Sequence, residues 1–368
     1  MSETGPGAPG SSGSQSRGRL GLVLLLIVGG LLALQLVRGA RTPRFASFDG
    51  EAMSTIWQIT LPEGKDPTAA AAAADACFTL FRRLDLELSE WKEGSPLSAV
   101  NRAAGVAPVA VPDELFGLVA RAVEIGRETE GAFDISWAAR WGLWDFRAEV
   151  PAVPSAGAIS ERVNLVDYRR VVLDSAARTI FLPVAGMKLG LGGIAKGYAL
   201  ERAAALLSER GFEDFLVVSG GQVYARGTRG GRPWLVGVRD PRGERDEIFA
   251  TLPLAGGSLS TSADNESFFI VGGVRYHHIL DPGTGWPATG LRSATVLHAD
   301  PTLADALSTA VLVLGRERGL AIAARLGAEA LVVDSQGAVA MTPGFEANLA
   351  LLHPPRRDEP PGPLAGGN

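Results

Sequence analysis

The sequence has a single cysteine, Cys77, and only four histidines among its 368 residues. One cysteine cannot form an internal disulfide, and so few thiols and imidazoles do not supply the clustered ligands of a zinc site. Cys77 lies among Ala and Phe residues at helical spacing, which favours a buried structural thiol over a nucleophile. The chain also lacks a block of Lys or Arg and carries a net charge of −5, which argues against binding to nucleic acid.

Glycine and proline are abundant, with 46 and 23 residues, beside a hydrophobic fraction of 46%. These values predict many turns and a sizeable core, in one large domain or two modest ones. Strand-like runs outnumber helical runs and seldom alternate strictly with them. We therefore expect an α+β fold with mixed or antiparallel sheets and packed helices.

A continuous apolar run covers residues 20–37. Its length suits one crossing of a bilayer, which takes roughly 20 apolar residues. Arg residues flank both ends, and the sequence that follows offers neither a good signal-peptidase site nor a cysteine that could carry a lipid. We expect an uncleaved signal anchor (a transmembrane helix) preceded by a disordered Gly/Ser-rich segment over residues 1–19. The rest of the sequence contains no second span.

Hydrophobic periodicity and turn residues predict the elements of a domain that we place at residues 45–350, followed by a flexible tail over 354–368. We expect helices over 67–88, about 112–129, 197–210, 302–314 and 319–326. We expect strands over 53–61 and 215–218, further strands up to 254, a hairpin over 268–280 and a last strand over 330–333.

A glycine-rich turn over residues 190–195 opens one of these helices and places Lys196 in its first turn. Glycine backbone, a helix N-terminus and a cation together can bind phosphate. The turn formally fits the dinucleotide fingerprint, but the acidic residues at 213–214 precede the next strand instead of ending it. A P-loop does not fit either, because Gly197 follows the lysine. An ordinary turn with an incidental lysine stays open as the alternative.

Two further segments carry groups suited to chemistry. His277 and His278 are neighbours in an expected strand, so at most one of them faces a given site. A histidine before the turn at Asp281 suits proton transfer, although a structural histidine is the alternative. Asp305 and Thr309 share one helix face and offer the oxygen ligands that Mg²⁺ prefers, although Asp305 could instead cap the helix.

Two other segments allow a functional and a structural interpretation. The small residues of 261–264 can approach a flat ring or a phosphate closely, and an ordinary loop is equally consistent with them. The segment 131–134 precedes three of the seven tryptophans, Trp137, Trp141 and Trp144. Core packing is the default for these rings, and a stacking wall for an aromatic cofactor is the sharper interpretation.

The order of these segments resembles the ApbE family of FAD:protein FMN transferases over roughly residues 50–345. The matching segments are 53–57, 89–101, 131–134 with Trp144, 192–198, 261–262, 276–287 and 305–309. The resemblance implies an enzyme that splits FAD, transfers FMN to a Thr (or Ser) hydroxyl of a target flavoprotein, and releases AMP.

The resemblance also implies roles for individual residues. Asp305, Thr309 and the backbone carbonyl of Ala195 would bind Mg²⁺, and His278 would be the base that deprotonates the acceptor hydroxyl. The residues that would contact FAD are Met53, Trp91, Phe133, Asp134, Gly193, Lys196, Ser262 and Ile279.

Three positions depart from the family pattern: Gly190 and Gln222 stand where the family usually has Asp, and Ala263 stands where it usually has Gly. Two alternatives therefore stay open, an FAD pyrophosphatase that yields FMN and AMP, and an FAD-binding protein without turnover. Together with the signal anchor, the resemblance implies a single-pass protein of the inner membrane with its domain on the extracytoplasmic side. The expected partners are FAD and an acceptor flavoprotein.

Overall fold

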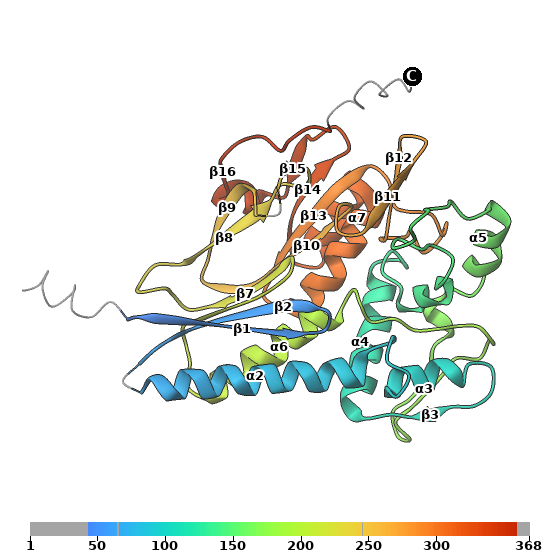
Figure 1. Ribbon diagram of the computed structural model, residues 1–368, viewed down its shortest axis with the longest axis horizontal. Coiled ribbons are helices and arrows are strands. Elements are labelled where there is room, and N and C mark those ends of the chain that lie inside the picture. Colours follow the sequence, from blue (N-terminus) through green and yellow to red (C-terminus); the bar gives the residue numbers. More distant parts are fainter. Residues whose placement is uncertain (1–42, 65, 245, 359–368) are drawn as a thin grey trace, which may run out of the picture. The chain divides into compact units, whose positions relative to one another are not determined.

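The computed structural model describes residues 43–64, 66–244 and 246–358 (Figure 1). The expected disordered segment over 1–19, the expected anchor over 20–37 and the tail beyond Asp358 lie outside these residues. Among the described residues, none of the helices combines the length and apolar character that crossing a bilayer requires. The folded unit starts at Phe45.

An antiparallel sheet of eight strands forms the centre of this unit, with the order β1-β2-β6-β7-β10-β13-β14-β15. The strands are β1 (Phe45–Ala52), β2 (Thr55–Pro62), β6 (Phe215–Ser219), β7 (Gln222–Arg226), β10 (Gly256–Ala263), β13 (Leu291–His298), β14 (Glu329–Asp334) and β15 (Val339–Met341). Along β6, the side chains of Phe215 and Val217 are fully buried, whereas Leu216 and Val218 are half-buried. This alternation assigns one face of the sheet to the main core.

Three helices cover that face: α2 (Pro67–Leu88), α6 (Ala195–Glu209) and α7 (Pro301–Arg325) (Figure 1). Asp66 caps α2 by accepting a 2.9 Å hydrogen bond from the backbone N–H of Thr68, and Pro67 suits the first helical position. Inside α7, Gly315 has φ 78° and ψ −177°, so the helix is interrupted there. The two helices expected over 302–314 and 319–326 are the two parts of α7.

A smaller sheet lies over part of the opposite face, with the order β16 (Ala350–Leu351), β9 (Ile248–Leu254) and β8 (Trp234–Arg239). Strand β8 alternates strictly: Trp234, Val236 and Val238 are buried, and Leu235 and Gly237 are exposed. The buried set packs with Leu331, Val333 and Phe345 into a second core. The short helix α8 (Pro343–Asn348) contributes Phe345 to it.

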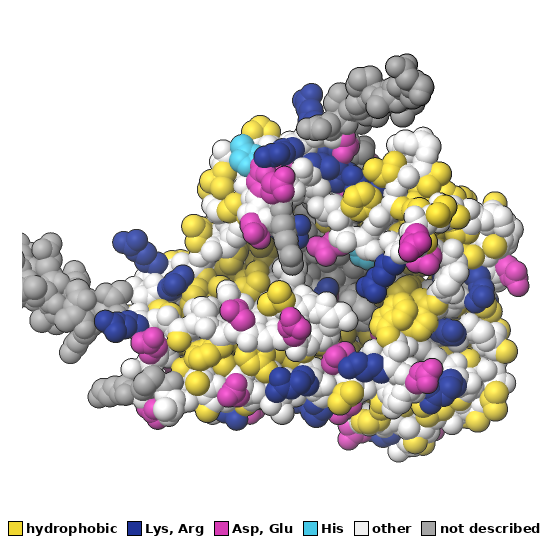
Figure 2. Space-filling model, in the orientation of Figure 1, with side chains coloured by type: hydrophobic (Ala, Val, Ile, Leu, Met, Phe, Trp, Pro, Cys, Tyr) yellow, Lys and Arg dark blue, Asp and Glu magenta, His cyan; other side chains and the backbone are white. Residues whose placement is uncertain are grey.

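The remaining elements surround one end of the α2 and α7 layer (Figure 1). They are α3 (Pro96–Arg102), β3 (Val109–Ala110), α4 (Asp113–Glu128), η1 (Ile135–Arg140), α5 (Ala156–Val163), η2 (Tyr168–Arg170), β4 (Val172–Asp174), β5 (Thr179–Phe181) and the hairpin β11 (Phe268–Val271)–β12 (Val274–His277). Acidic and basic side chains of the described residues are interspersed over the face that Figure 2 shows. The expected α+β class with antiparallel sheets is confirmed.

Several expected elements differ from the observed ones. The strand expected over 53–61 is present as β2, but it begins two residues later, because Met53 and Ser54 form the turn of the β1–β2 hairpin with φ values of 52° and 58°. Residues 261–263, for which an ordinary loop was one of two open alternatives, belong to strand β10. The strand over 330–333 is followed by β15 and β16, so it is not the last.

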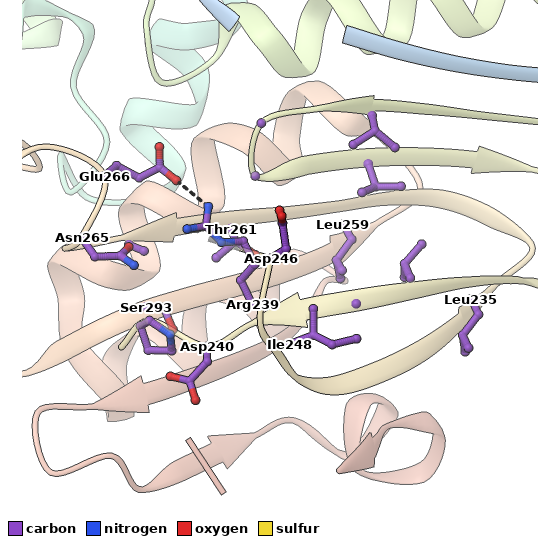
Figure 3. A pocket seen from close by; sticks show the side chains of 18 of the residues that line it. Leu235, Arg239, Asp240, Asp246, Ile248, Leu259, Thr261, Asn265, Glu266 and Ser293 are labelled. Carbon is purple, nitrogen blue, oxygen red and sulfur yellow. Dashed lines mark hydrogen bonds and ion pairs between the residues drawn. The ribbon is translucent and has the colours of Figure 1, made fainter. Parts of the chain in front are cut away.

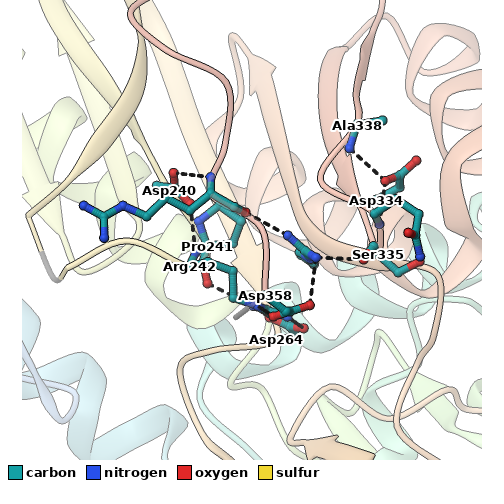
Figure 4. A network of polar contacts seen from close by, with 11 residues as sticks. Asp240, Pro241, Arg242, Asp264, Asp334, Ser335, Ala338 and Asp358 are labelled. Atoms are coloured by element: carbon teal, nitrogen blue, oxygen red, sulfur yellow. Dashed lines mark hydrogen bonds and ion pairs between the residues drawn. The ribbon is translucent and has the colours of Figure 1, made fainter. Parts of the chain in front are cut away.

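The tail that we expected to be flexible is anchored as far as Asp358 (Figure 4). The backbone N–H of Arg356 donates to Oδ2 of Asp240 at 2.8 Å, and Arg292 Nη1 donates to the Arg356 carbonyl at 2.9 Å. Asp358 accepts a 2.7 Å hydrogen bond from Arg292 and also pairs with Arg242. These contacts fasten residues 356–358 to the loop after β8 and to the start of β13.

Candidate active site

The first turns of α6 and α7 meet at Gly197. A Cβ at this position would lie 2.2 Å from the carbonyl oxygen of Pro301 and 2.6 Å from Cβ of Asp305. Only glycine therefore permits this approach of the two helices. The same approach lets the backbone N–H of Gly197 donate a 2.8 Å hydrogen bond to Oδ2 of Asp305.

Asp305 is a buried carboxylate, 4% exposed, and both its oxygens accept hydrogen bonds. Oδ1 accepts from Nε2 of Gln222 on β7. Burial raises the pKa of Asp305, while the positive charge of Lys196 and the hydrogen bonds from Gly197 and Gln222 lower it in part. The other amide atom of Gln222, Oε1, is buried and finds no hydrogen-bond partner within the described part of the chain.

Asp305 does not cap α7, because the cap is Asp300, whose side chain accepts from the backbone N–H groups of Thr302 and Leu303 at 2.9 and 3.1 Å. The capping alternative that the sequence left open for Asp305 is therefore wrong. Its carboxylate points to Gly197 and Gln222 from the second turn of α7. Among the described residues, Asp305 neither caps a helix nor forms an ion pair within hydrogen-bonding distance, so its carboxylate is available for a ligand.

Hydroxyl groups line the next turn of α7 against strand β10. Thr309 Oγ1 lies 3.2 Å from Ser262 Oγ, and Ser262 Oγ lies 2.8 Å from Ser308 Oγ. A Cβ on Gly193 would lie 3.6 Å from Thr309 Oγ1 and 3.3 Å from Cε2 of Phe133. The glycine-rich turn, Phe133, Ser262 and Thr309 are thus brought together, although they come from four separate parts of the chain.

The donor set at this point fits Mg²⁺. It combines the Asp305 carboxylate and the Thr309 hydroxyl with the backbone of Ala195, the first residue of α6. Carboxylate, hydroxyl and carbonyl oxygens are the ligands of hard cations, and the unpartnered Oε1 of Gln222 adds another oxygen beside Asp305. Lys196, whose charge acts on Asp305, adds a cation at the N-terminus of α6.

The two neighbouring histidines have different environments. His277 is buried; its Nε2 donates to the carbonyl oxygen of Ala288 at 2.8 Å, and its Nδ1 accepts from the backbone N–H of Ile279 at 3.3 Å. Burial lowers the pKa of His277. Both ring nitrogens are engaged within the fold, so His277 serves the structure.

His278 follows β12 and is exposed, with its backbone N–H bonded to the carbonyl oxygen of Ser267 at 3.0 Å. The protein atoms that crowd around its ring, followed by the charge of His277, lower its pKa to about 4, while Glu266 acts in the opposite direction. At pH 7 the imidazole is neutral and can accept a proton.

Three side chains hold the glycine-rich turn in place. Asn101 exchanges two hydrogen bonds with the backbone of Leu189, at 2.9 and 2.7 Å. Trp137 Nε1 donates to the Gly190 carbonyl at 3.1 Å, and the buried carboxylate of Glu90 accepts from the Leu191 N–H at 3.4 Å. Burial raises the pKa of Glu90. The sequence analysis assigned no role to Glu90. Its position directly before Trp91, an expected FAD-contacting residue, could have indicated that it lies near the site.

The other expected FAD-contacting residues take varied positions. Trp91 is 68% exposed and stacks on Trp141, with ring centroids 4.0 Å apart and planes 15° apart. Asp134 caps η1, because its carboxylate accepts from Ser136 N at 2.8 Å, Ser136 Oγ at 2.6 Å and Tyr168 N at 2.9 Å. Its carboxylate is therefore engaged within the fold, and its direct contribution to the site is to fix the backbone after Phe133.

Met53 and Ile279 lie on two further loops, one between β1 and β2 and one after β12. Met53 lies in the β1–β2 turn and is partly buried against the main core. This hairpin lies close to the β6–β7 turn, since a Cβ on Gly220 would be 3.3 Å from Thr55 Oγ1. Ile279 is 8% exposed and follows His278 directly. Trp144 lies apart, in an aromatic cluster with Phe269 and Tyr276, so for this ring the core-packing interpretation is correct.

Sequence comparison identifies the family. The profile of the ApbE family matches residues 53–332, which span every segment of the site described above. The chain belongs to the ApbE family.

Individual ApbE proteins support this assignment. The chain is 33% identical over 316 residues to the FAD:protein FMN transferase of Treponema pallidum, covering 82% of this chain and 87% of the relative. It is 28% identical over 311 residues to the enzyme of that name from Escherichia coli K12, covering 82% and 88%. The crystal structure of the ApbE protein of Thermotoga maritima superposes with a TM-score of 0.77 at 33% identity, covering 83% of this chain and 99% of that chain.

Proposed function

We propose that this ApbE protein uses Mg²⁺ to transfer FMN from FAD to a Thr or Ser hydroxyl of an acceptor flavoprotein, with release of AMP. The observation that carries the proposal is the convergence of Asp305, Thr309 and the turn before Lys196, together with a neutral imidazole, His278, that is near enough to feel the charge of Lys196. The names of the relatives from Treponema pallidum and Escherichia coli support it.

Each side chain has a separate part in this chemistry. Asp305, Thr309 and the carbonyl of Ala195 would hold Mg²⁺, which when bound neutralises charge on the pyrophosphate. Lys196 and the N-terminus of α6 offset the remaining negative charge. His278 takes the proton of the acceptor hydroxyl while its oxygen bonds to the phosphorus of the FMN half. The bond between that phosphorus and the bridging oxygen breaks, and AMP leaves with the electron pair.

The exposed Trp91–Trp141 stack and Phe133, whose ring would lie 3.3 Å from a Cβ on Gly193, offer apolar surfaces near this centre, and Met53 is proposed as a further FAD contact. A stacked pair of indoles is a suitable platform for a flat aromatic ring such as isoalloxazine. Asp134 and Glu90 act indirectly in this scheme. They hold the backbone of the Phe133 segment and of the glycine-rich turn through the hydrogen bonds described above.

Incubation of the full-length protein in detergent with FAD, Mg²⁺ and an extract of its own cells tests the proposal. We expect fluorescent flavin on a protein band in a denaturing gel, and an equal amount of AMP. A His278→Ala variant should still bind FAD and lose the labelled band. AMP and free FMN without any labelled band would indicate a pyrophosphatase, and unchanged FAD would indicate a binding protein.

We also propose that residues 20–37 anchor the protein in the inner membrane, with the domain on the extracytoplasmic side. The apolar run and its flanking Arg residues support this proposal. The protein should sediment with membranes after a high-salt wash and should be digested by protease added to spheroplasts. Recovery in the soluble fraction, or protection from the protease, would contradict it.

A further inference from the structure

A cavity of about 320 Å³ lies on the face of the central sheet opposite to α6 and α7 (Figure 3). Strand β10 defines the two faces: Ser260 and Ser262 contact Ser308 on α7, whereas Leu259 and Thr261 line the cavity. The apolar residues of its lining are Leu216, Val218, Val223, Leu235, Val236, Ile248 and Leu259. Leu235, on the free edge strand β8, is 69% exposed.

The two ends of this cavity differ in polarity. Figure 3 shows Leu235 at the opposite end from Asn265 and Glu266. At the polar end, Arg239 and Glu266 form an ion pair of 3.4 Å. In the wall, Ser293 is 1% exposed and its Oγ finds no hydrogen-bond partner among the described residues. A buried hydroxyl without a partner is suited to bind a polar group of a ligand.

The polar end of the cavity is linked to His278, the proposed base, through Glu266 and Ser267. Glu266 precedes Ser267, whose carbonyl oxygen accepts the backbone N–H of His278. Two charged side chains are close enough to act on the pKa of His278: Glu266, which lines the cavity, raises it, and Lys196, which follows the glycine-rich turn, lowers it. His278 therefore lies between two approaches, one from the Asp305 face of the sheet and one from the cavity.

We propose that this cavity binds an extended segment of the acceptor protein. An apolar side chain of the segment lies between Leu235, Ile248 and the sheet, and the hydroxyl residue lies beyond Glu266, next to His278. The inference rests on the proposed function and adds where its second substrate binds. FAD is the less suitable occupant, because Lys196 and the other groups that suit phosphate lie on the opposite face and Arg239 is already paired with Glu266.

The geometry also sets the spacing of the recognised residues. Leu235 and Arg239 are four residues apart on β8. An extended chain rises about 3.3 Å per residue, so this distance is about 13 Å. An acceptor segment that runs alongside β8 would therefore place its apolar residue about four to six positions from the modified hydroxyl.

A peptide library tests this inference. We would immobilise 15-residue peptides with a central Thr, vary one position at a time between Leu, Lys and Asp, and measure bound flavin after incubation with FAD and Mg²⁺. The wild-type protein should prefer Leu over Asp by at least about tenfold at one position four to six residues from the Thr. Leu235→Glu should shift that preference to Lys. Leu86→Glu changes an equally apolar residue on α2, 60% exposed, and should leave the preference unchanged.

The outcomes separate this inference from the proposed function. Wild-type labelling of peptides without an apolar preference, or the same preference in the Leu235→Glu variant, would overturn the cavity as the acceptor site. Labelling of a protein in the cell extract but of no peptide would also overturn recognition of an extended segment. If neither is labelled, the transferase function itself fails, and the acceptor site fails with it. FAD binding should be equal in all three proteins, since Leu235 and Leu86 do not line the Asp305 face.

Discussion

Replacing Asp305 by Asn should stabilise the metal-free protein, although Asp305 lies at the centre of the proposed metal site. The wild-type carboxylate is 4% exposed, and burial raises its pKa, which means that the ionised form is held at a cost in stability. The amide has the same shape without the charge. Gly197 N–H can still donate to its oxygen, and the new NH₂ group can donate to Oε1 of Gln222 once the Gln222 amide rotates.

The size of the expected stability change in Asp305→Asn follows from the interactions that the substitution removes and those that it keeps. Both hydrogen bonds of the carboxylate are replaced, while one buried charge disappears together with its attraction to Lys196. Removal of a buried charge with its hydrogen bonds maintained is worth about 1–3 kcal/mol. For a domain of this size, about 2 °C in Tm accompanies each kcal/mol, so we expect a rise of roughly 2–6 °C.

Thermal unfolding of the full-length protein at pH 7 in detergent and EDTA measures this change. Asp134→Asn is the matched control, because that buried carboxylate accepts only from N–H and O–H donors of Ser136 and Tyr168. An amide nitrogen there would face a donor, so the control should lose about 1–3 kcal/mol. Mg²⁺ should raise the Tm of the wild type and not that of Asp305→Asn. A fall in Tm for Asp305→Asn as large as that of the control, or an unchanged response to Mg²⁺, would refute the reasoning.

Three further predictions follow from the site. Gly197→Ala should destabilise the protein by about 3 kcal/mol, measured by urea unfolding, because the new methyl group overlaps the Pro301 carbonyl; a loss below 1 kcal/mol would contradict the close helix contact. Since the pKa of His278 is lowered, the base stays deprotonated to lower pH, and the acid limb of kcat/KM for flavin transfer should lie well below pH 6.5. Burial raises the pKa of Glu90, so stability from this group is present below its usual value of 4.5 and is lost as pH rises through the folded pKa. Glu90→Gln should therefore gain stability relative to the wild type between pH 4 and 8, and a constant difference would argue against a buried, ionising carboxylate.

Elements with a strong local signal could be predicted from the sequence. Helix α2 has the expected bounds, because Asp66 and Pro67 mark its start and Phe81, Leu84 and Leu88 recur at helical spacing. Strand β13 carried no such signal. Six of its eight residues are buried, so both of its faces are covered and polar and apolar residues do not alternate.

The sequence was enough to propose which residues form the site, but not which of them contact one another. Asp300 followed by Pro301 repeats the Asp–Pro signal that opens α2, so the cap of α7 could be predicted locally, whereas the hydrogen-bond partners of Asp305, Gly197 and Gln222, are distant in sequence. The support that Glu90 gives to the glycine-rich turn depends likewise on a contact across about a hundred residues. Such contacts arise from tertiary packing, to which periodicity and capping rules do not apply.

At two of the three positions that depart from the family pattern, Gly190 and Gln222, a neighbouring side chain of this chain fits the residue that is present. At Gly190, a Cβ would lie 3.0 Å from the indole of Trp137, so this ring occupies the space next to the position where the family usually has an Asp side chain. At position 222, Gln donates to Asp305, whereas an Asp would place a second negative charge beside it and raise the pKa of one of the two carboxylates. With two fewer carboxylates, the proposed metal site would attract Mg²⁺ less strongly and would repel the pyrophosphate of the proposed substrate FAD less. The replacements at positions 190 and 222 would therefore change the affinity for Mg²⁺ relative to that for FAD. The residues that the proposed chemistry needs are all retained: Asp305, Thr309, Lys196 and His278.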